Sequence, residues 1–450
     1  MTMNFEKECS ISTYSVIPRI VPVGVEKTIS IRFMGDGLRY DPTRIKRLGH
    51  VRFDDAMEYT VSIIPMELYD YTYVEPEQAY FTTKVRPKNG TISVNYVFEG
   101  EQEWSITVIS DADARAGKAP LVFRVYSLES DLYELNPYCG DLHVHSIGSD
   151  GREDIGVTAA NYRKEGYDFM ALTDHNTRSS SVKLLDIFAD VPCDMKLFHG
   201  EEVHPRGELH VVNFGSKYSV NDLYRSDPEK YHAELLAEAG TIKTPKYVNP
   251  LEYCYRKWIH NEINKAGGIS IVTHPYWICK DVYNMNTATL RYVFESGIYD
   301  AFELLGGESV HENNIQSSFW QQTREDGLKI PIVGSSDSHG TDPAVLFGIA
   351  RTILFAKDTE FKSIVEAIKG GYSTAVEHPR GESNRVYGPY RLVKYVRFLL
   401  NYYFPGHDEL CVEEGRLMRE YALGDAEAAD ALRALHGRVA RYREHTLRGR

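Results

Sequence analysis

The chain has 450 residues, the length of about three ordinary domains, and 42% of them are hydrophobic, so at least one large apolar core is expected. A charged fraction of 26% is typical of a folded globular protein and excludes the composition of a disordered chain. The 51 basic and 64 acidic residues give a net charge of -13, which disfavours nucleic acid as a partner but allows a small anionic substrate in a local positive pocket or on a metal.

The N-terminal part, residues 1–135, is predicted to be all-β. Its first residues include Glu6, Lys7 and Glu8 where a signal peptide would be apolar, and no segment is apolar over the about 18 residues of a transmembrane helix. A cytoplasmic protein without membrane contact is therefore expected. Segments with alternating apolar and polar residues recur between turn signals and predict a small immunoglobulin-like sandwich. These segments are 28–33, 59–63, 91–96, 104–109 and 121–126.

Residues 140–355 are predicted to form an α/β domain in which short strands alternate with helices. Repeated strand–helix units are typical of a mainly parallel sheet or a barrel. Residues 216–249 interrupt the alternation and are interpreted as an insertion that covers the substrate. The expected strands are 141–145, 167–172, 208–214, 269–273, 301–305 and 330–334, and the expected helices are 155–165, 251–265 and 313–326.

Residues 356–450 are predicted to be a mainly helical extension, with helices over 361–369 and 391–403. In the second of these helices, Leu392 and Val396 share one apolar face. Such a face favours packing against the core or a homo-oligomer interface over a membrane anchor.

Metal-binding residue types accompany the strands that are expected in the α/β domain. Because the C-terminal ends of barrel strands meet at one mouth, clusters that are distant in sequence are expected to converge there. Imidazole and carboxylate ligands favour Zn²⁺, Mn²⁺ or Fe²⁺, and the six scattered cysteines, which form no Cys-x-x-Cys pair, indicate neither a thiolate site nor a disulfide framework. The candidate ligands are His143, His145, Asp150, His175, Glu202, His210, His274, Asp337 and His339.

Two details of this pattern carry further expectations. The spacing His143-x-His145 directs both imidazoles to one face of a strand and so to one ion. A carboxylate such as Glu202 can bridge two ions that act together. Asp174 is expected either to orient a ligand imidazole or to cap a loop. A single such motif is more often structural, but several in order at strand ends favour a metal site.

Together these motifs resemble the PHP domain, the metallohydrolase module of bacterial replicative polymerases and of one class of histidinol phosphatase. The resemblance implies a distorted (β/α)₇ barrel with two or three divalent metal ions at its C-terminal mouth. The pairing with an N-terminal β domain is similar to the carbaryl-esterase-like branch of that family. The matching stretches are 140–151, 171–177, 200–203, 208–210, 267–275 and 334–339.

The resemblance also implies which residues hold the ions. Asp150 stands where many members of the family have histidine, and Glu202 is chosen over Glu201 because the family's pattern is glycine, any residue, then glutamate. The implied sets are His143, His145, Glu202 and Asp337 for one ion, Asp150, His175 and His339 for a second, and Glu202, His210 and His274 for a third.

The expected activity is hydrolysis of a phosphoester in a small phosphorylated substrate by a metal-bound hydroxide, with Glu202, Asp337 and Asp174 as catalytic residues. The same hydroxide could instead cleave a carboxyl ester, an amide or a carbamate. A non-catalytic PHP module used for binding is a third hypothesis. That hypothesis predicts eroded ligands, whereas all nine positions hold competent residue types.

Overall fold

The computed structural model describes residues 13–35, 52–67, 81–207, 209–307, 309–342, 347–379 and 381–450. The expectations that concern residues 1–10, Cys9 and Glu208 lie outside the described residues. The other five cysteines are free thiols. Within the described ranges, no helix is both long enough and apolar enough to cross a membrane.

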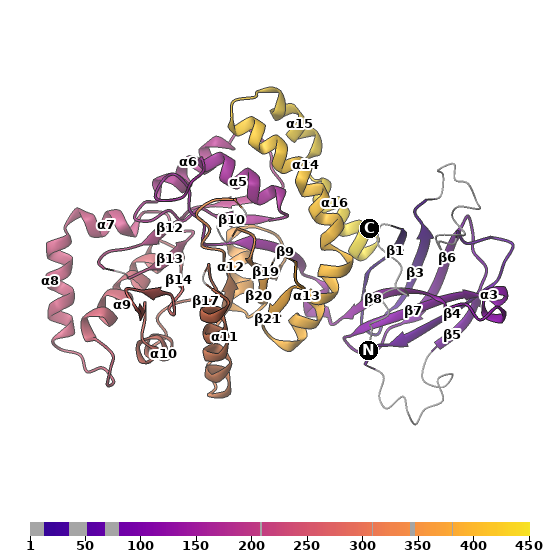
Figure 1. Ribbon diagram of the computed structural model, residues 1–450, viewed down its shortest axis with the longest axis horizontal. Helices are drawn as coiled ribbons and strands as arrows, with labels where there is room; N and C mark the ends of the chain where they lie inside the picture. The colour runs from indigo at the N-terminus through magenta and orange to yellow at the C-terminus, as the bar shows by residue number, and fades with distance from the viewer. Residues whose placement is uncertain are drawn as a thin grey trace. The chain divides into compact units, whose positions relative to one another are not determined.

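The chain divides into two compact units, each made of segments that are not consecutive in the sequence (Figure 1). The first unit contains Met1–Leu135, Lys394–His407 and Val439–Arg450, and the second contains Asn136–Val393 and Asp408–Arg438. The last hundred residues therefore contribute to both units. The boundaries of the three predicted domains stay a prediction.

The first unit contains two β-sheets, and the five strands expected from alternation are all present. The sheets have the strand orders β1-β3-β6 and β2-β8-β7-β4-β5, and every pair is antiparallel except β2 with β8. Alternation along β4 buries Tyr59, Val61 and Ile63 in an apolar core. The strands are β1 (Tyr14–Ile17), β2 (Ile20–Pro22), β3 (Glu26–Phe33), β4 (Tyr59–Pro65), β5 (Phe81–Val85), β6 (Thr91–Val97), β7 (Glu103–Ser110) and β8 (Leu121–Leu128).

Short helices complete the first unit. Two follow the strands β7 and β8, and two form the C-terminal end of the chain. They are α3 (Asp111–Arg115), α4 (Ser130–Tyr133), α16 (Arg438–Arg443) and the π-helix η2 (Glu444–Arg448), and most of the longer helix α13 (Tyr390–Tyr402) belongs to the same unit.

The second unit is a mixed α/β fold with two curled sheets. The first sheet has the order β11-β10-β9-β19-β20-β21 and the second has the order β12-β13-β14-β17-β18. Two single bridges, Val144 with Ser338 and His175 with Glu202, join the sheets beyond the ends of β9 and β10. The strands are β9 (Asn136–Asp141), β10 (Phe169–Ala171), β11 (Lys196–Phe198), β12 (Gly200–Val203), β13 (Val211–Phe214), β14 (Ile269–Val272), β17 (Ala301–Leu305), β18 (Ile332–Gly334), β19 (Ala350–Ala356), β20 (Ser373–Glu377) and β21 (Arg385–Tyr387).

Only part of this unit is parallel, in contrast to the expectation from the repeated strand–helix pattern. β9-β10-β11 and β14-β17-β18 are parallel, whereas β12-β13-β14 and β9-β19-β20-β21 are antiparallel. The connection between β12 and β13 is too short for a crossover helix, so these strands form an antiparallel pair. The segment predicted to be mainly helical also contributes β20 and β21, which extend the first sheet.

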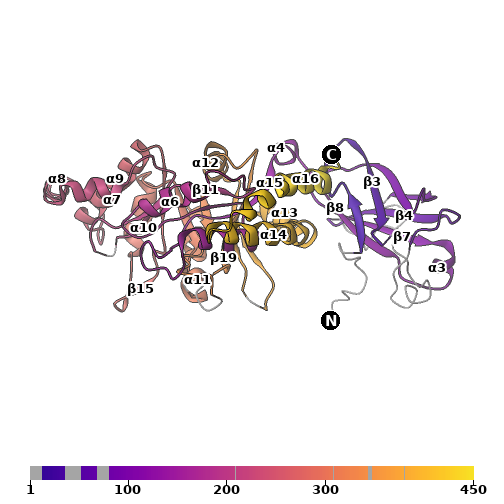
Figure 2. The same cartoon turned by 90° about the horizontal axis from the view of Figure 1, so that it is seen from above.

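Helices surround these sheets, and those from the predicted insertion are α7 and α8. In Figures 1 and 2, α7, α8 and α9 lie side by side, and the three helices contact one another. The helices are α5 (Ile155–Lys164), α6 (Ser179–Ile187), α7 (Val220–Ser226), α8 (Pro228–Ala239), α9 (Pro250–Lys265), α10 (Thr287–Glu295), α11 (Val310–Glu325), α12 (Phe361–Lys369), the larger part of α14 (Phe404–Ala422) and α15 (Glu427–Leu435). A small hairpin of β15 (Ile278–Cys279) and β16 (Val282–Tyr283) follows β14.

Candidate metal centre

The strands of the second unit carry the predicted ligands to one place. β9 ends at Asp141, two residues before His143, so the strand lies earlier in the chain than the predicted range 141–145 and shares only Asp141 with it. Val144 nevertheless pairs with Ser338, which keeps the backbone between His143 and His145 extended. His175 follows β10, Glu202 lies in β12, His210 precedes β13, His274 follows β14, and Asp337 and His339 follow β18.

Glu202 lies at the centre of this cluster and its side chain is fully buried. One carboxylate oxygen, Oε2, lies 3.2 Å from Nε2 of His143 and 2.7 Å from Nδ1 of His175. The other oxygen, Oε1, lies 2.8 Å from Nδ1 of His210 and 3.3 Å from Nε2 of His274. The two oxygens of one carboxylate therefore face different groups of imidazoles.

Asp337 completes the set that was expected around the first ion. Its Oδ1 lies 2.9 Å from Nε2 of His145 and 3.2 Å from Nε2 of His143. The same histidine nitrogens lie 3.5 Å and 3.2 Å from Oε2 of Glu202. The structure thus brings all four residues of this set together.

Asp150 brings together the set expected around the second ion. Its two oxygens lie 3.5 Å from Nε2 of His175 and 3.4 Å from Nε2 of His339. Asp150 is 57% exposed and His339 33% exposed, whereas His143, His145 and Glu202 have no exposed side-chain surface. This side of the cluster is therefore more open to solvent than the side of His143 and His145.

Sequence reasoning missed a further histidine at the cluster. Nε2 of His204 lies 3.7 Å from Oε1 of Glu202, and the rings of His204 and His210 are 3.6 Å apart at their centroids. The signal was present in the sequence, because His204 is two residues beyond Glu202 and residues at that spacing share one face of a strand.

The chemistry of the donors fits divalent cations. Nε2 of His143, Nδ1 of His175 and Oε2 of Glu202 are buried and close together, yet none of these atoms makes a hydrogen bond of ordinary geometry. Buried polar atoms normally make hydrogen bonds, so lone pairs that converge in this way indicate a binding site for a cation. Imidazole nitrogens and carboxylate oxygens are the ligands of Zn²⁺, Mn²⁺ and Fe²⁺.

Electrostatics keep the carboxylates of the cluster charged. Burial would raise the pKa of Glu202, but His143 and His210 outweigh burial and lower it well below its usual value. The pKa of Asp337 is lowered in the same way, because His143 and His145 outweigh the effect of burial. Burial would lower the pKa of His143, yet the surrounding carboxylates, Asp337 foremost, raise it well above its usual value. The carboxylates thus favour a positive charge among them, whether on an imidazole or on a bound cation.

Glu303 on β17 supports two of the ligand-bearing segments. Its Oε2 lies 2.9 Å from Nδ1 of His143, and its Oε1 accepts a hydrogen bond from the backbone N–H of His274 at 3.3 Å. The contact with Nδ1 leaves Nε2 of His143 directed toward Glu202 and Asp337. Glu303 therefore orients a candidate ligand through its second ring nitrogen.

The neighbouring Glu201 points away from the cluster. Its carboxylate accepts hydrogen bonds from Ser219 Oγ at 2.6 Å, from the backbone N–H of Val220 at 2.6 Å and from Nδ2 of Asn213 at 2.9 Å. Successive side chains of a strand point to opposite faces, so Glu201 anchors the start of α7 while Glu202 faces the imidazoles.

Asp174 has a different place from that expected for a residue that orients an imidazole. Its carboxylate accepts hydrogen bonds from the backbone N–H of Ser146 at 2.7 Å, from Ser146 Oγ at 2.6 Å and from Ser149 Oγ at 2.8 Å. Among the described contacts of Asp174, none is with a histidine ring. Asp174 therefore holds the loop that carries Asp150, because serine donors occupy its oxygens.

The backbone at two ligand positions is strained. His274 has φ of +25° and Asp337 has φ of +49°, in the left-handed region that non-glycine residues rarely adopt. Strained backbone of this kind is retained where the surroundings hold a side chain in a required direction, and it is common at functional sites. In both residues the side chain points to the cluster around Glu202.

Comparison with known proteins gives partial matches. No protein-family model matches the chain. DNA polymerase/3'-5' exonuclease PolX of Bacillus subtilis is 47% identical over 51 residues, which are 11% of this chain and 9% of that protein. The chain thus spans a small part of that relative.

Solved structures cover more of the chain at lower identity. Endonuclease Q, in complex with a 27-mer duplex that carries an abasic lesion, has 17% identity and a TM-score of 0.34, and the match covers 52% of this chain and 57% of that one. A two-domain protein from Bacteroides vulgatus has 15% identity and a TM-score of 0.38, with 55% of this chain and 66% of that chain covered. That protein contains a predicted PHP-like metal-dependent phosphoesterase, which is thus among the proteins to which this chain is similar.

Proposed function

We propose that this chain is a metal-dependent hydrolase whose catalytic centre is the cluster around Glu202. The observation that carries the proposal is the buried carboxylate of Glu202, whose two oxygens face separate groups of imidazoles. Divalent ions bound there would polarise a scissile bond and lower the pKa of a water molecule to about 7. Glu202 and Asp337 are the proposed catalytic residues.

The proposed ligand sets follow the contacts between the side chains. Two or three ions of Zn²⁺, Mn²⁺ or Fe²⁺ suit these donors. The proposed sets are His143, His145, Glu202 and Asp337; Asp150, His175 and His339; and Glu202, His210 and His274, with His204 as an additional ligand of the last set.

The proposed scaffold is a distorted (β/α)₇ barrel. The seven strands β9, β10, β12, β13, β14, β17 and β18 are linked by strand pairing and by the two single bridges. These bridges involve Val144, His175 and Glu202, which are ligands or lie next to one. The closure of the barrel and the construction of the site thus depend on the same residues.

The protein side chains prepare the site by orientation. Glu303 holds His143 through Nδ1, so that the other nitrogen faces the cluster. Asp174 holds the loop of Asp150 through Ser146 and Ser149. Ligands that are fixed before the substrate arrives do not need to reorganise during the reaction.

A small phosphorylated molecule is the proposed substrate. The cluster opens toward solvent at Asp150, His175 and His339, where the side chains are partly exposed. A phosphoester carries several charged oxygens that several cations can bind together. Such a site lets a protein of net charge -13 bind an anion.

The proposal is tested by metal analysis followed by a screen of phosphomonoesters, phosphodiesters and carboxyl esters. We expect bound divalent metal, hydrolysis of phosphomonoesters, loss of activity with a chelator and recovery when the ion is restored. Turnover of carboxyl esters or amides alone would favour the second class of substrate. Absence of both metal and hydrolysis would contradict the proposed function.

A further inference from the structure

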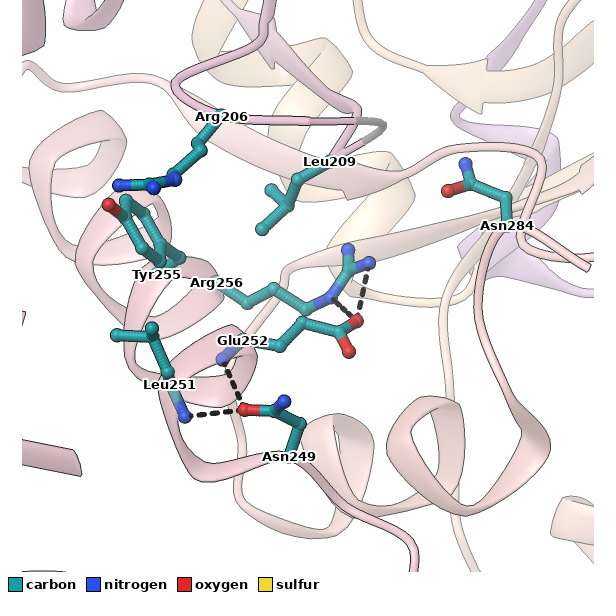
Figure 3. A pocket seen from close by; sticks show the side chains of 8 residues that line it. All are labelled: Arg206, Leu209, Asn249, Leu251, Glu252, Tyr255, Arg256 and Asn284. Atoms are coloured by element: carbon teal, nitrogen blue, oxygen red, sulfur yellow. Dashed lines mark hydrogen bonds and ion pairs between the residues drawn. The ribbon is translucent and has the colours of Figure 1, made fainter. Parts of the chain in front are cut away.

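A cavity of about 280 Å³ lies beside the third ligand set in the second unit (Figure 3). It is formed by the segment before His210, by the first turns of α9 and by one residue after the β15–β16 hairpin. We call it the Arg256 pocket. Its lining residues are Arg206, Leu209, Asn249, Leu251, Glu252, Tyr255, Arg256 and Asn284.

The Arg256 pocket is adjacent to the candidate ligands. Asn284 lines it, and Nδ2 of Asn284 lies 3.4 Å from Nδ1 of His274. Leu209, on the other side, directly precedes His210 in the chain. The pocket and the cluster are therefore neighbours, and Asn284 contacts both.

Arg256 supplies a buried guanidinium whose hydrogen bonds are incomplete. Its side chain is only 2% exposed, and Nε and Nη2 donate to Oε1 of Glu252 at 3.0 Å and 2.9 Å. Nη1 is buried and makes no hydrogen bond of ordinary geometry, although the guanidinium also interacts with the hydroxyl of Tyr299, and Figure 3 shows Nη1 directed away from Glu252, on the side of Leu209. A buried donor without an acceptor is costly, so an acceptor from a ligand would be favoured here.

The charge of the pocket selects an anion. Arg206, which is exposed, adds a second guanidinium next to Tyr255, while Glu252 is the one acidic residue among the described residues of the lining. Asn249 is engaged in the fold, since its Oδ1 accepts hydrogen bonds from the backbone N–H groups of Leu251 and Glu252. Two guanidinium groups against one carboxylate favour a carboxylate or phosphate, which pair well with arginine.

We propose that the Arg256 pocket binds a second anionic group of the substrate. The inference rests on the proposed function, because the scissile ester would lie at the cluster around Glu202. The substrate class is then a small phosphoester that carries a separate carboxylate or phosphate. Asn284 lies between the two sites, since it lines the pocket and touches His274.

The test compares esters that differ only in the second group. Phenyl phosphate, the 3- and 4-carboxyphenyl phosphates and 1,4-phenylene bisphosphate are hydrolysed by the metal-loaded full chain, and kcat/KM is measured for each. We expect at least one ester with a second anion to exceed phenyl phosphate by about tenfold, as a charged hydrogen bond allows. Comparison of the carboxyphenyl phosphates with 1,4-phenylene bisphosphate shows whether the pocket binds a carboxylate or a phosphate.

Two variants connect this preference to the pocket. Arg256→Met should abolish the preference and Arg206→Ala should reduce it, while kcat/KM for phenyl phosphate stays within about twofold of the unmodified chain. Arg225→Ala is the matched control, because Arg225 is an exposed arginine of α7 outside the lining. If circular dichroism shows that Arg256→Met does not fold, the result for Arg206→Ala decides whether the pocket causes the preference. Arg206 is exposed, so this substitution should leave the fold intact.

Binding of inert analogues separates this inference from the proposed function. Phenylphosphonate and its 3- and 4-carboxy derivatives are titrated by calorimetry into the same proteins. Tighter binding of a carboxy derivative than of phenylphosphonate, weakened by Arg206→Ala, supports the proposed role of the pocket. This holds even if no ester is hydrolysed. Absence of hydrolysis would overturn the proposed function but not the role of the pocket. Equal kcat/KM and equal affinity for all members of the series would overturn the pocket.

Discussion

Arg163 and Glu202 are each the centre of a buried group of charges in the second unit, and the two groups differ in how their charge is balanced. Nε of Arg163 donates to Oε2 of Glu414 at 2.7 Å, and Nη1 lies 3.3 Å from Oδ1 of Asp168. Here the chain supplies a permanent cation for its own carboxylates. Around Glu202, by contrast, the buried carboxylates of Glu202 and Glu303 and the partly buried carboxylate of Asp337 face imidazoles, which are strong cations only when protonated.

The Arg163 group is structural, because it stabilises the fold. The Glu202 group is receptive, meaning that it can bind a cation from outside the chain. A buried charge is tolerated when it is paired, and the charge of Arg163 is paired with Glu414 and Asp168 within the fold, although Nη2 of Arg163 makes no hydrogen bond. The Glu202 group has lone pairs that converge without hydrogen bonds, so a cation from outside the chain completes it. Mutations in the first group should therefore change stability, and mutations in the second should change metal binding and hydrolysis.

Asp337→Asn should have the largest effect, and it acts on the receptive group. The amide weakens the ligand set that His143, His145 and Asp337 form, so kcat/KM for a phosphomonoester should fall at least about 10³-fold. Asp326→Asn is the control, because this surface carboxylate pairs with Arg291 outside the cluster. Undiminished hydrolysis by Asp337→Asn would contradict the proposal that the Glu202 group, unlike the Arg163 group, carries out the reaction.

Glu414→Ala should destabilise the fold by about 3–5 kcal/mol, since it leaves the charge of Arg163 partly unpaired in the interior. Metal content per folded molecule should stay the same. The neighbouring Glu413→Ala removes an exposed carboxylate that pairs with Arg438 and should change stability by less than about 1 kcal/mol. Urea unfolding of the two variants measures the difference, and equal losses would contradict a structural role for the Arg163 group.

Glu303→Gln should have a smaller effect, because Glu303 acts through His143. Loss of a carboxylate that orients a ligand imidazole typically lowers metal affinity by about 10- to 100-fold. Titration against a competing chelator measures this change, with Glu295→Gln on the surface of α10 as the control. An unchanged affinity would mean that Glu303 does not hold the ring of His143.

The sequence allowed the ligand types and their convergence to be predicted, because strand ends of an α/β fold meet at one mouth whatever lies between them. All nine predicted ligands contact at least one other member of the set. The five predicted strands of the first unit also appear, since alternation of apolar residues marks a half-buried strand directly.

Features that depend on long-range pairing escaped prediction. β20 and β21 are short strands: β20 pairs with β19, and β21 pairs with β20. The local sequence pattern does not reveal this pairing. Asp174 took the loop-capping alternative because Ser146 and Ser149 reach its oxygens, and such contacts depend on the course of the loop. The incomplete hydrogen bonding of Arg256 is likewise a property of three-dimensional packing.

Metal content of Glu202→Gln and Glu201→Gln tests the central claim most directly. The two residues are adjacent, identical and fully buried, but Glu202 faces the imidazoles and Glu201 anchors α7. Mass spectrometric metal analysis of both folded variants, with the unmodified chain as reference, should show loss of at least one equivalent from Glu202→Gln and full content in Glu201→Gln. Equal metal content in the two variants would contradict the account.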